Sequence, residues 1–162
     1  MQTIIVIKFT DEWRKENTVD SVYHFTIFLV RNIIQIGGTM STIEFYETTD
    51  GKSPIKDFFE SLSDKDFAIV SRDLSLLELK GHFIREPKSK IVDRKEKIFE
   101  LRSKFPSGIS RIFYFFMIGD KIIITNGYIK KTTKTSKKEI EKAIKFKHEY
   151  ERRVHDDSAG LY

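Results

Sequence analysis

Basic side chains gather where three predicted strands begin or end. Arg102 lies at the end of one strand and Arg111 at the start of the next, so both flank the same short turn. The turn should bring their guanidinium groups to one end of a sheet. Each guanidinium can hold phosphate oxygens bidentately, so the pair indicates an anionic ligand. Further cations follow in the loop after the third strand: Lys130, Lys131 and Lys134.

The first of these strands is predicted over residues 97–103. Phe99 and Leu101 alternate with Glu100 and Arg102. An alternation of period two is typical of a strand with one apolar and one polar face. Glu100 and Arg102 should therefore project from the same face.

Two more strands complete the unit. Residues 111–118 are apolar at nearly every position, which predicts a central strand that is covered on both faces. Residues 121–129 form the third strand. Residues 106–108 and 119–120 supply the two turns, as expected for Pro-Ser-Gly and Gly-Asp.

The preceding segment predicts a strand and two helices. Residues 42–47 alternate as a strand, and Ser53-Pro54 is a strong helix start. Ser63 begins a second helix that Gly81 should end. Because the connection between these two helices is short, they are predicted to form an antiparallel helical hairpin.

Two segments carry most of the remaining charge. Residues 82–97 are predicted to form a charged loop, with a short strand at 90–92 as an alternative. Ser136 and Glu139 have capping-box spacing and begin a basic last helix. The predicted fold class is α+β: a small antiparallel sheet of about four strands, an N-terminal helical hairpin and a C-terminal basic helix.

Length and composition limit the classes of function. A chain of 162 residues with 40% hydrophobic content predicts one domain with a real core. Its net charge of +5 favours an anionic partner. The chain contains no cysteine, which excludes disulfides and thiolate metal sites and fits a reducing cytoplasm. The chain has no run of 18 apolar residues, so neither a membrane-spanning helix nor a membrane partner is expected.

Residues 1–39 differ in character from the rest. Their charges cancel, so the net positive charge belongs to residues 40–162. Gly37-Gly38 precede Met40, and two glycine codons can spell a purine-rich ribosome-binding sequence before a start codon. We therefore expect residues 1–39 to be a translated leader and residues 40–162 to form the domain. The alternative is a genuine N-terminal extension packed on that domain.

Three motifs carry a family resemblance: ELR at 100–102, SRIFYFF at 110–116 and GYIKKTTKTSKKEI at 127–140. With this order of elements, residues 42–153 resemble the RelE/ParE toxin superfamily, and within it the HigB-like, phage-derived toxins of type II toxin–antitoxin modules. That branch typically has proline where this chain has Ser136. The resemblance implies a RelE-like fold and a ribosome-dependent endoribonuclease that cleaves mRNA and inhibits translation. It also implies a helix-turn-helix, HigA-like antitoxin, through which alone operator DNA would be bound.

Such cleavage has a 2′-hydroxyl attack the adjacent phosphorus, and it requires a base, cations and an acid but no cofactor. All four histidines lie outside the three-strand unit. The resemblance therefore assigns catalysis to basic residues, and a lysine crowded by cations would have a lowered pKa and could act as the base. Glu100 is a second candidate base. The catalytic candidates are Arg102, Arg111, Lys130, Lys131, Lys134 and Glu100.

RNA binding has candidates on the strands and on the last helix. Two tyrosines could stack on a splayed base, and three lysines could contact phosphates. These residues are Tyr114, Tyr128, Lys137, Lys138 and Lys142. The acids and histidines lack the spacing of metal ligands, so no metal site is predicted.

Each candidate also has an ordinary structural interpretation. Glu100 and Arg102 could be a surface ion pair, and Arg111 could only solvate a hairpin. Tyr114 could belong to the core. In either interpretation the arginine side chains are expected to end in solvent. Two other functions remain open: a non-catalytic, ParE-like inhibitor of DNA gyrase and a simple nucleic-acid-binding module.

Overall fold

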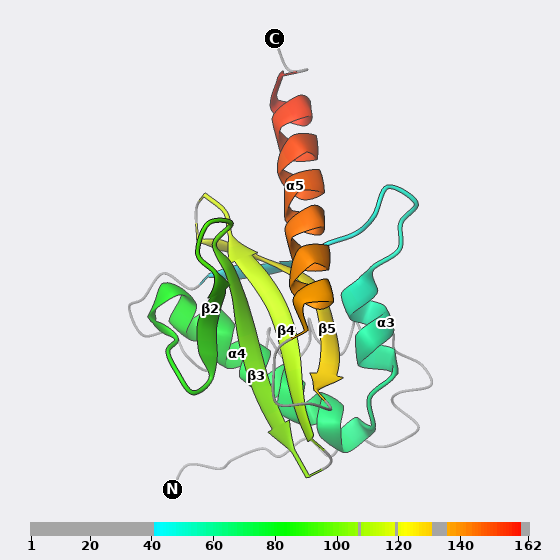
Figure 1. Cartoon of the computed structure of the whole chain (residues 1–162), viewed down its shortest axis with the longest axis vertical. Helices are drawn as coiled ribbons and strands as arrows, with labels where there is room; N and C mark the ends of the chain where they lie inside the picture. Colours follow the sequence, from blue (N-terminus) through cyan, green and yellow to red (C-terminus); the bar gives the residue numbers. More distant parts are fainter. Residues whose placement is uncertain (1–40, 107, 119, 131–135, 160–162) are drawn as a thin grey trace, which may run out of the picture. The chain divides into compact units, whose positions relative to one another are not determined.

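The structure is a computed structural model that describes residues 41–106, 108–118, 120–130 and 136–159. Within these residues one sheet contains five strands, in the order β1-β5-β4-β3-β2 (Figure 1). The predicted leader at residues 1–39 lies outside the described residues. The strands are β1 (Thr42–Phe45), β2 (Ser89–Asp93), β3 (Ile98–Phe105), β4 (Gly108–Phe116) and β5 (Lys121–Lys130).

The sheet is mixed, which corrects the predicted sheet of about four antiparallel strands. β1 runs parallel to β5, whereas the other neighbouring strands are antiparallel. A parallel pair needs a long crossover connection, and here the connection includes two α-helices, a 3-10 helix and three strands. The fifth strand, β2, comes from the segment predicted to be a charged loop with a short strand as its alternative. β4 is central and is buried from Ser110 to Phe115, as the apolar run predicted, but Ile118 at the end of the predicted strand is exposed.

Three α-helices are present among the described residues: α3 (Pro54–Glu60), α4 (Asp64–Lys80) and α5 (Lys137–Ala159). A 3-10 helix, η1 (Gly81–Phe83), follows α4. Ser63 caps α4 as predicted, because its Oγ accepts a hydrogen bond from the Asp66 N–H at 3.2 Å. None of the helices in the described part of the chain is both long and apolar enough to cross a bilayer.

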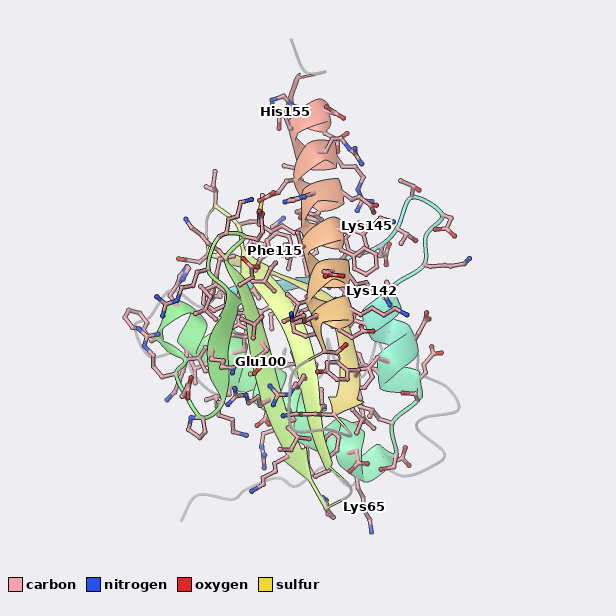
Figure 2. All side chains as sticks on the ribbon, in the orientation of Figure 1. Lys65, Glu100, Phe115, Lys142, Lys145 and His155 are labelled. Carbon is pink, nitrogen blue, oxygen red and sulfur yellow. The ribbon has the colours of Figure 1, made fainter. Side chains whose placement is uncertain are left out.

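The helices cover opposite faces of the sheet. α3 packs against β5 and α4 against β3, and the two helices contact the sheet more than each other. The predicted antiparallel helical hairpin is therefore not a closely packed pair. α5 packs on the other face, where Ala143 and Phe146 join Phe113 and Phe115 in one buried cluster. Lys142 and Lys145 are exposed on this helix, whereas Phe115 of β4 is fully buried; all three are labelled in Figure 2.

Gly127 allows α3 to approach the sheet closely. A Cβ atom at this position would lie 2.7 Å from Cδ1 of Phe58, which belongs to α3. Contacts this short do not occur between real side chains, so a larger residue would displace the helix. The glycine of the Asn-Gly-Tyr sequence is thus a packing requirement of the α3 face.

Candidate functional site

The register of the sheet brings the predicted catalytic residues together. Arg102 on β3 lies directly opposite Arg111 on β4, and Glu100 on β3 lies directly opposite Lys90 on β2. Residues opposite one another across a pair of strands project from the same face. These four residues therefore share the face on which α5 packs.

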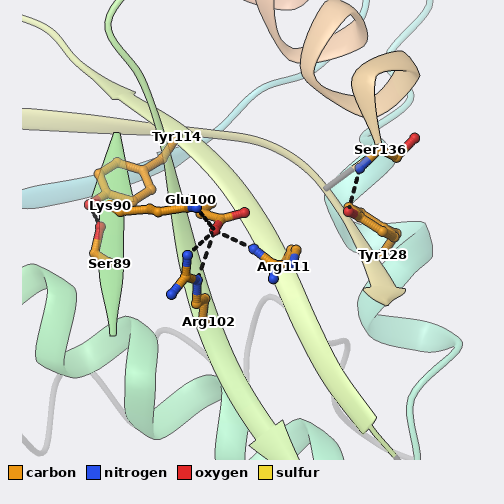
Figure 3. Close-up of polar contacts among 8 residues, drawn as sticks. All are labelled: Ser89, Lys90, Glu100, Arg102, Arg111, Tyr114, Tyr128 and Ser136. Carbon is orange, nitrogen blue, oxygen red and sulfur yellow. Dashed lines mark hydrogen bonds and ion pairs between the residues drawn. The ribbon is translucent and has the colours of Figure 1, made fainter. Parts of the chain in front are cut away.

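Glu100 is the centre of this cluster (Figure 3). Its side chain is fully buried, and its Oε1 atom accepts hydrogen bonds from Nε of Arg102 at 2.8 Å and from Nη1 of Arg111. Nη2 of Arg102 also lies 2.7 Å from this oxygen, and Nζ of Lys90 lies 3.9 Å from it. A buried carboxylate is stable only when its charge is paired and hydrogen-bonded, and two guanidinium groups meet this requirement.

Arg111 is much less exposed than the sequence suggested. Its side chain is 6% exposed and that of Arg102 is 21% exposed, so the expectation that both end in solvent is wrong. The reason is the position of Arg111 on the central strand, where the neighbouring strands flank it on both sides. Among the described residues, the Nε–H of Arg111 has no hydrogen-bond acceptor.

Lys130 adds a fourth cation at the end of β5, where it pairs with Ile109 of β4. It lies two residues beyond Tyr128, the residue opposite Arg111, and is therefore on the same face. Partial removal from water lowers the pKa of Lys130, and the charge of Arg111 lowers it further, while Glu100 opposes this effect. Lys130 thus has an increased tendency to release its proton.

Hydrogen bonds hold the start of α5 beside the cluster. The backbone N–H of Ser136 donates to the Tyr128 hydroxyl at 3.0 Å. Nδ2 of Asn126 donates to the Glu139 carbonyl at 3.3 Å and to Glu139 Oε2 at 3.0 Å. Tyr128 also stacks on Phe113, with ring centroids 6.0 Å apart. Strand β5 therefore fixes the beginning of the basic helix relative to Arg111.

The other predicted binding residues are dispersed. Lys137, Lys138 and Lys142 are exposed on α5, and the Lys142 ammonium group lies 5.8 Å from the Phe146 ring centroid. Tyr114 is fully buried on the α4 face, away from the cluster, and its hydroxyl is 2.6 Å from Ser89 Oγ. Burial raises its pKa to about 12. A stacking role for Tyr114 is therefore incompatible with its position. Lys131 and Lys134 lie outside the described residues.

Lys90 is the one member of the cluster that the sequence analysis did not select. It lies in a stretch so rich in charge that no single lysine stands out. The alternative short strand at 90–92 was the only available signal, and it could not show which residue of β3 would lie opposite. No group of histidines and carboxylates suited to a metal ion occurs in the part of the chain that the structure describes.

The comparison with protein families matches residues 57–148 to the phage-derived protein Gp49-like family (DUF891). This match spans more than half of the chain and includes α4, the sheet from β2 to β5 and the first half of α5. No curated protein matches the chain. The matched region includes the whole cluster around Glu100. The chain therefore belongs to the phage-derived Gp49-like family, a family that includes RelE-like toxins.

Proposed function

We propose that this protein is the toxin of a type II toxin–antitoxin module and acts as a HigB-like, ribosome-dependent endoribonuclease. Membership of the Gp49-like family is consistent with a toxin–antitoxin context. The observation that carries the proposal is the cluster itself: four cations gather around one buried carboxylate on the α5 face of the sheet. Such an excess of preorganised positive charge suits the phosphorane that forms when RNA is cleaved.

In this proposal, Glu100 is a positioning residue rather than the general base. Its carboxylate is fully buried and held by two guanidinium groups, so it cannot reach a 2′-hydroxyl. Its role would be to hold Arg102 and Arg111 side by side. The arginines would then bind the non-bridging phosphate oxygens.

Lys130 is the proposed general base, because its pKa is lowered and it lies beside Arg111. Its neutral amine would take the proton of the 2′-hydroxyl as the 2′-oxygen attacks phosphorus. The bond from phosphorus to the 5′-oxygen would break, and that oxygen would take up a proton from water. Lys131 and Lys134 stay catalytic candidates from the sequence alone.

The cluster contains no strong acid–base pair, and this supports dependence on the ribosome. A catalyst that relies on cations needs its substrate held in the reactive geometry. We expect the ribosomal A site to hold the mRNA in this way, so cleavage of naked RNA should be slow. A helix-turn-helix, HigA-like antitoxin would neutralise the toxin, and the complex of the two would bind operator DNA.

The test is cleavage of mRNA by the purified protein with and without programmed ribosomes, with mapping of the new mRNA ends. We expect cuts at the A-site codon only when ribosomes are present, and their loss in Arg102→Ala. Lys95→Ala, on an exposed turn, should cleave as the wild type does. Inhibition of DNA gyrase without any cleavage would favour the ParE-like alternative. RNA binding with neither effect would favour a binding module.

A further inference from the structure

The cations of the cluster form a diagonal row across four neighbouring strands. Lys130 pairs with the residue of β4 two positions before Arg111, whereas Lys90 lies opposite the residue of β3 two positions before Arg102. The row therefore runs from Lys130 on β5, past the two arginines, to Lys90 on β2. Neighbouring strands are about 4.8 Å apart, so the row crosses roughly 14 Å of sheet. This is longer than a single phosphate group requires.

Lys90 makes a weaker contact with Glu100 than either Arg102 or Arg111 does. Its ammonium group lies 3.9 Å from Oε1, which is too long for a hydrogen bond, and its side chain is 36% exposed. Both arginines would keep the carboxylate paired if Lys90 moved away. Lys90 can therefore turn toward an arriving anion without leaving a buried charge uncompensated.

The backbone that carries Lys90 is well anchored. Lys88 forms an ion pair with the buried Asp73 of α4, with its Nζ 2.8 Å from both carboxylate oxygens. The Lys88 carbonyl accepts a hydrogen bond from the Arg102 N–H at 2.8 Å. The start of the edge strand is thus fixed to α4 and to β3, which limits the movement of Lys90 to its side chain.

We propose that Lys90 forms a second phosphate subsite, so that the RNA backbone crosses the sheet diagonally from Lys130 to Lys90. This inference rests on the proposed function for the identity of the substrate. The phosphate between the arginines would be the scissile one, and the phosphate at Lys90 its neighbour along the strand. Lys90 would therefore contribute to binding and register, and little to the chemical step.

The test compares Lys90→Gln with Lys95→Gln, a lysine on the adjoining turn whose side chain is 91% exposed. Binding of a short oligouridylate is measured by fluorescence anisotropy over a range of salt concentrations. Loss of one phosphate contact on a single strand should reduce the slope of log affinity against log salt by about 0.7. On programmed ribosomes, Lys90→Gln should raise KM roughly fivefold and leave kcat nearly unchanged. Lys90→Arg should retain the wild-type slope, and Lys95→Gln should match the wild type in both assays.

The two proposals fail in different ways. The wild type could cleave no mRNA while Lys90→Gln still reduces the slope of log affinity against log salt. That result would support the subsite and contradict the proposed nuclease activity. Unchanged slope and KM in Lys90→Gln would overturn the subsite, as would an absence of oligouridylate binding by the wild type. A lower melting temperature with an unchanged slope would also overturn it, because Lys90 would then serve only Glu100.

Discussion

Arg102 and Arg111 lie directly opposite each other on neighbouring antiparallel strands, and both donate to the same oxygen of Glu100. Like charges in this arrangement repel and would destabilise the pair of strands. The buried carboxylate offsets that repulsion. The same three residues therefore contribute both to the stability of the sheet and to the proposed site.

Glu100→Gln should destabilise the fold strongly. Glutamine keeps the shape of the side chain but removes the charge that holds the two guanidinium groups together. Breaking a buried ion pair typically costs about 3–5 kcal/mol, and we expect a loss of this order in urea unfolding. Glu141→Gln, on the exposed side of α5, should change stability by no more than about 0.5 kcal/mol. Equal midpoints for the two variants would show that Glu100 does not organise the cluster.

Alanine substitutions of the two arginines should lower the free energy of unfolding by different amounts, although both arginines are needed for cleavage. Arg111→Ala removes the nearly buried partner of Glu100 and should cost about 3 kcal/mol. Arg102→Ala should cost about 1–2 kcal/mol, because water can reach its more exposed position. In single-turnover cleavage on ribosomes, each variant should be slower by roughly a hundredfold or more.

Arg111→Lys separates the charge of Arg111 from the shape of its guanidinium group. Lysine keeps the charge beside Glu100 but lacks the planar fork that holds two oxygens. It should therefore restore part of the stability and only part of the rate. Wild-type cleavage by both Arg102→Ala and Arg111→Ala would refute the assignment of the site.

The cleavage rate should rise with pH because of Lys130. Removal from water and the charge of Arg111 lower its pKa, so its neutral, proton-accepting form accumulates at a lower pH than for a free lysine. The single-turnover rate should increase with pH and level off below the ordinary lysine value of about 10.4. Lys130→Arg, which stays protonated, should be slow and should lose this rise. A pH profile that is identical in the variant would exclude Lys130 as the base.

Tyr46 should link the stability of the fold to alkaline pH. Burial and a hydrogen bond to Glu149 raise the pKa of Tyr46 from 10.0 to about 12. A raised pKa in the folded state stabilises the fold below pH 10, and this contribution is lost as the pH rises toward 12. Tyr46→Phe keeps the stacking on Phe146 but removes the hydroxyl, at a cost of about 0.5–1.5 kcal/mol near neutral pH.

The measurement for Tyr46 is urea unfolding at several pH values between neutral and alkaline. The difference in stability between the wild type and Tyr46→Phe should shrink as the pH approaches 12. A constant difference over this range would contradict the proposed link. The experiment is independent of RNA cleavage, because Tyr46 and Glu149 join the loop after β1 to the middle of α5.

Local signals in the sequence predicted those parts of the fold that depend on neighbouring residues. The alternation of Phe99 and Leu101 with Glu100 and Arg102 indicated a two-faced strand, and the apolar run of β4 indicated the sheet centre. Ser63 marked the start of α4 and Gly81 its end. These signals work because caps, turns and side-chain periodicity involve contacts over only a few residues.

Long-range pairing was decided only by the tertiary structure. The parallel alignment of β1 with β5 and the position of Lys90 opposite Glu100 both join segments whose partners no local pattern specifies. Alternation placed Arg102 on a polar face, but it could not show that Arg111, on the central strand, would be buried by its neighbours. Register and coverage depend on how all the elements share one core, so the same residues that looked like surface charges became a buried carboxylate and its arginines.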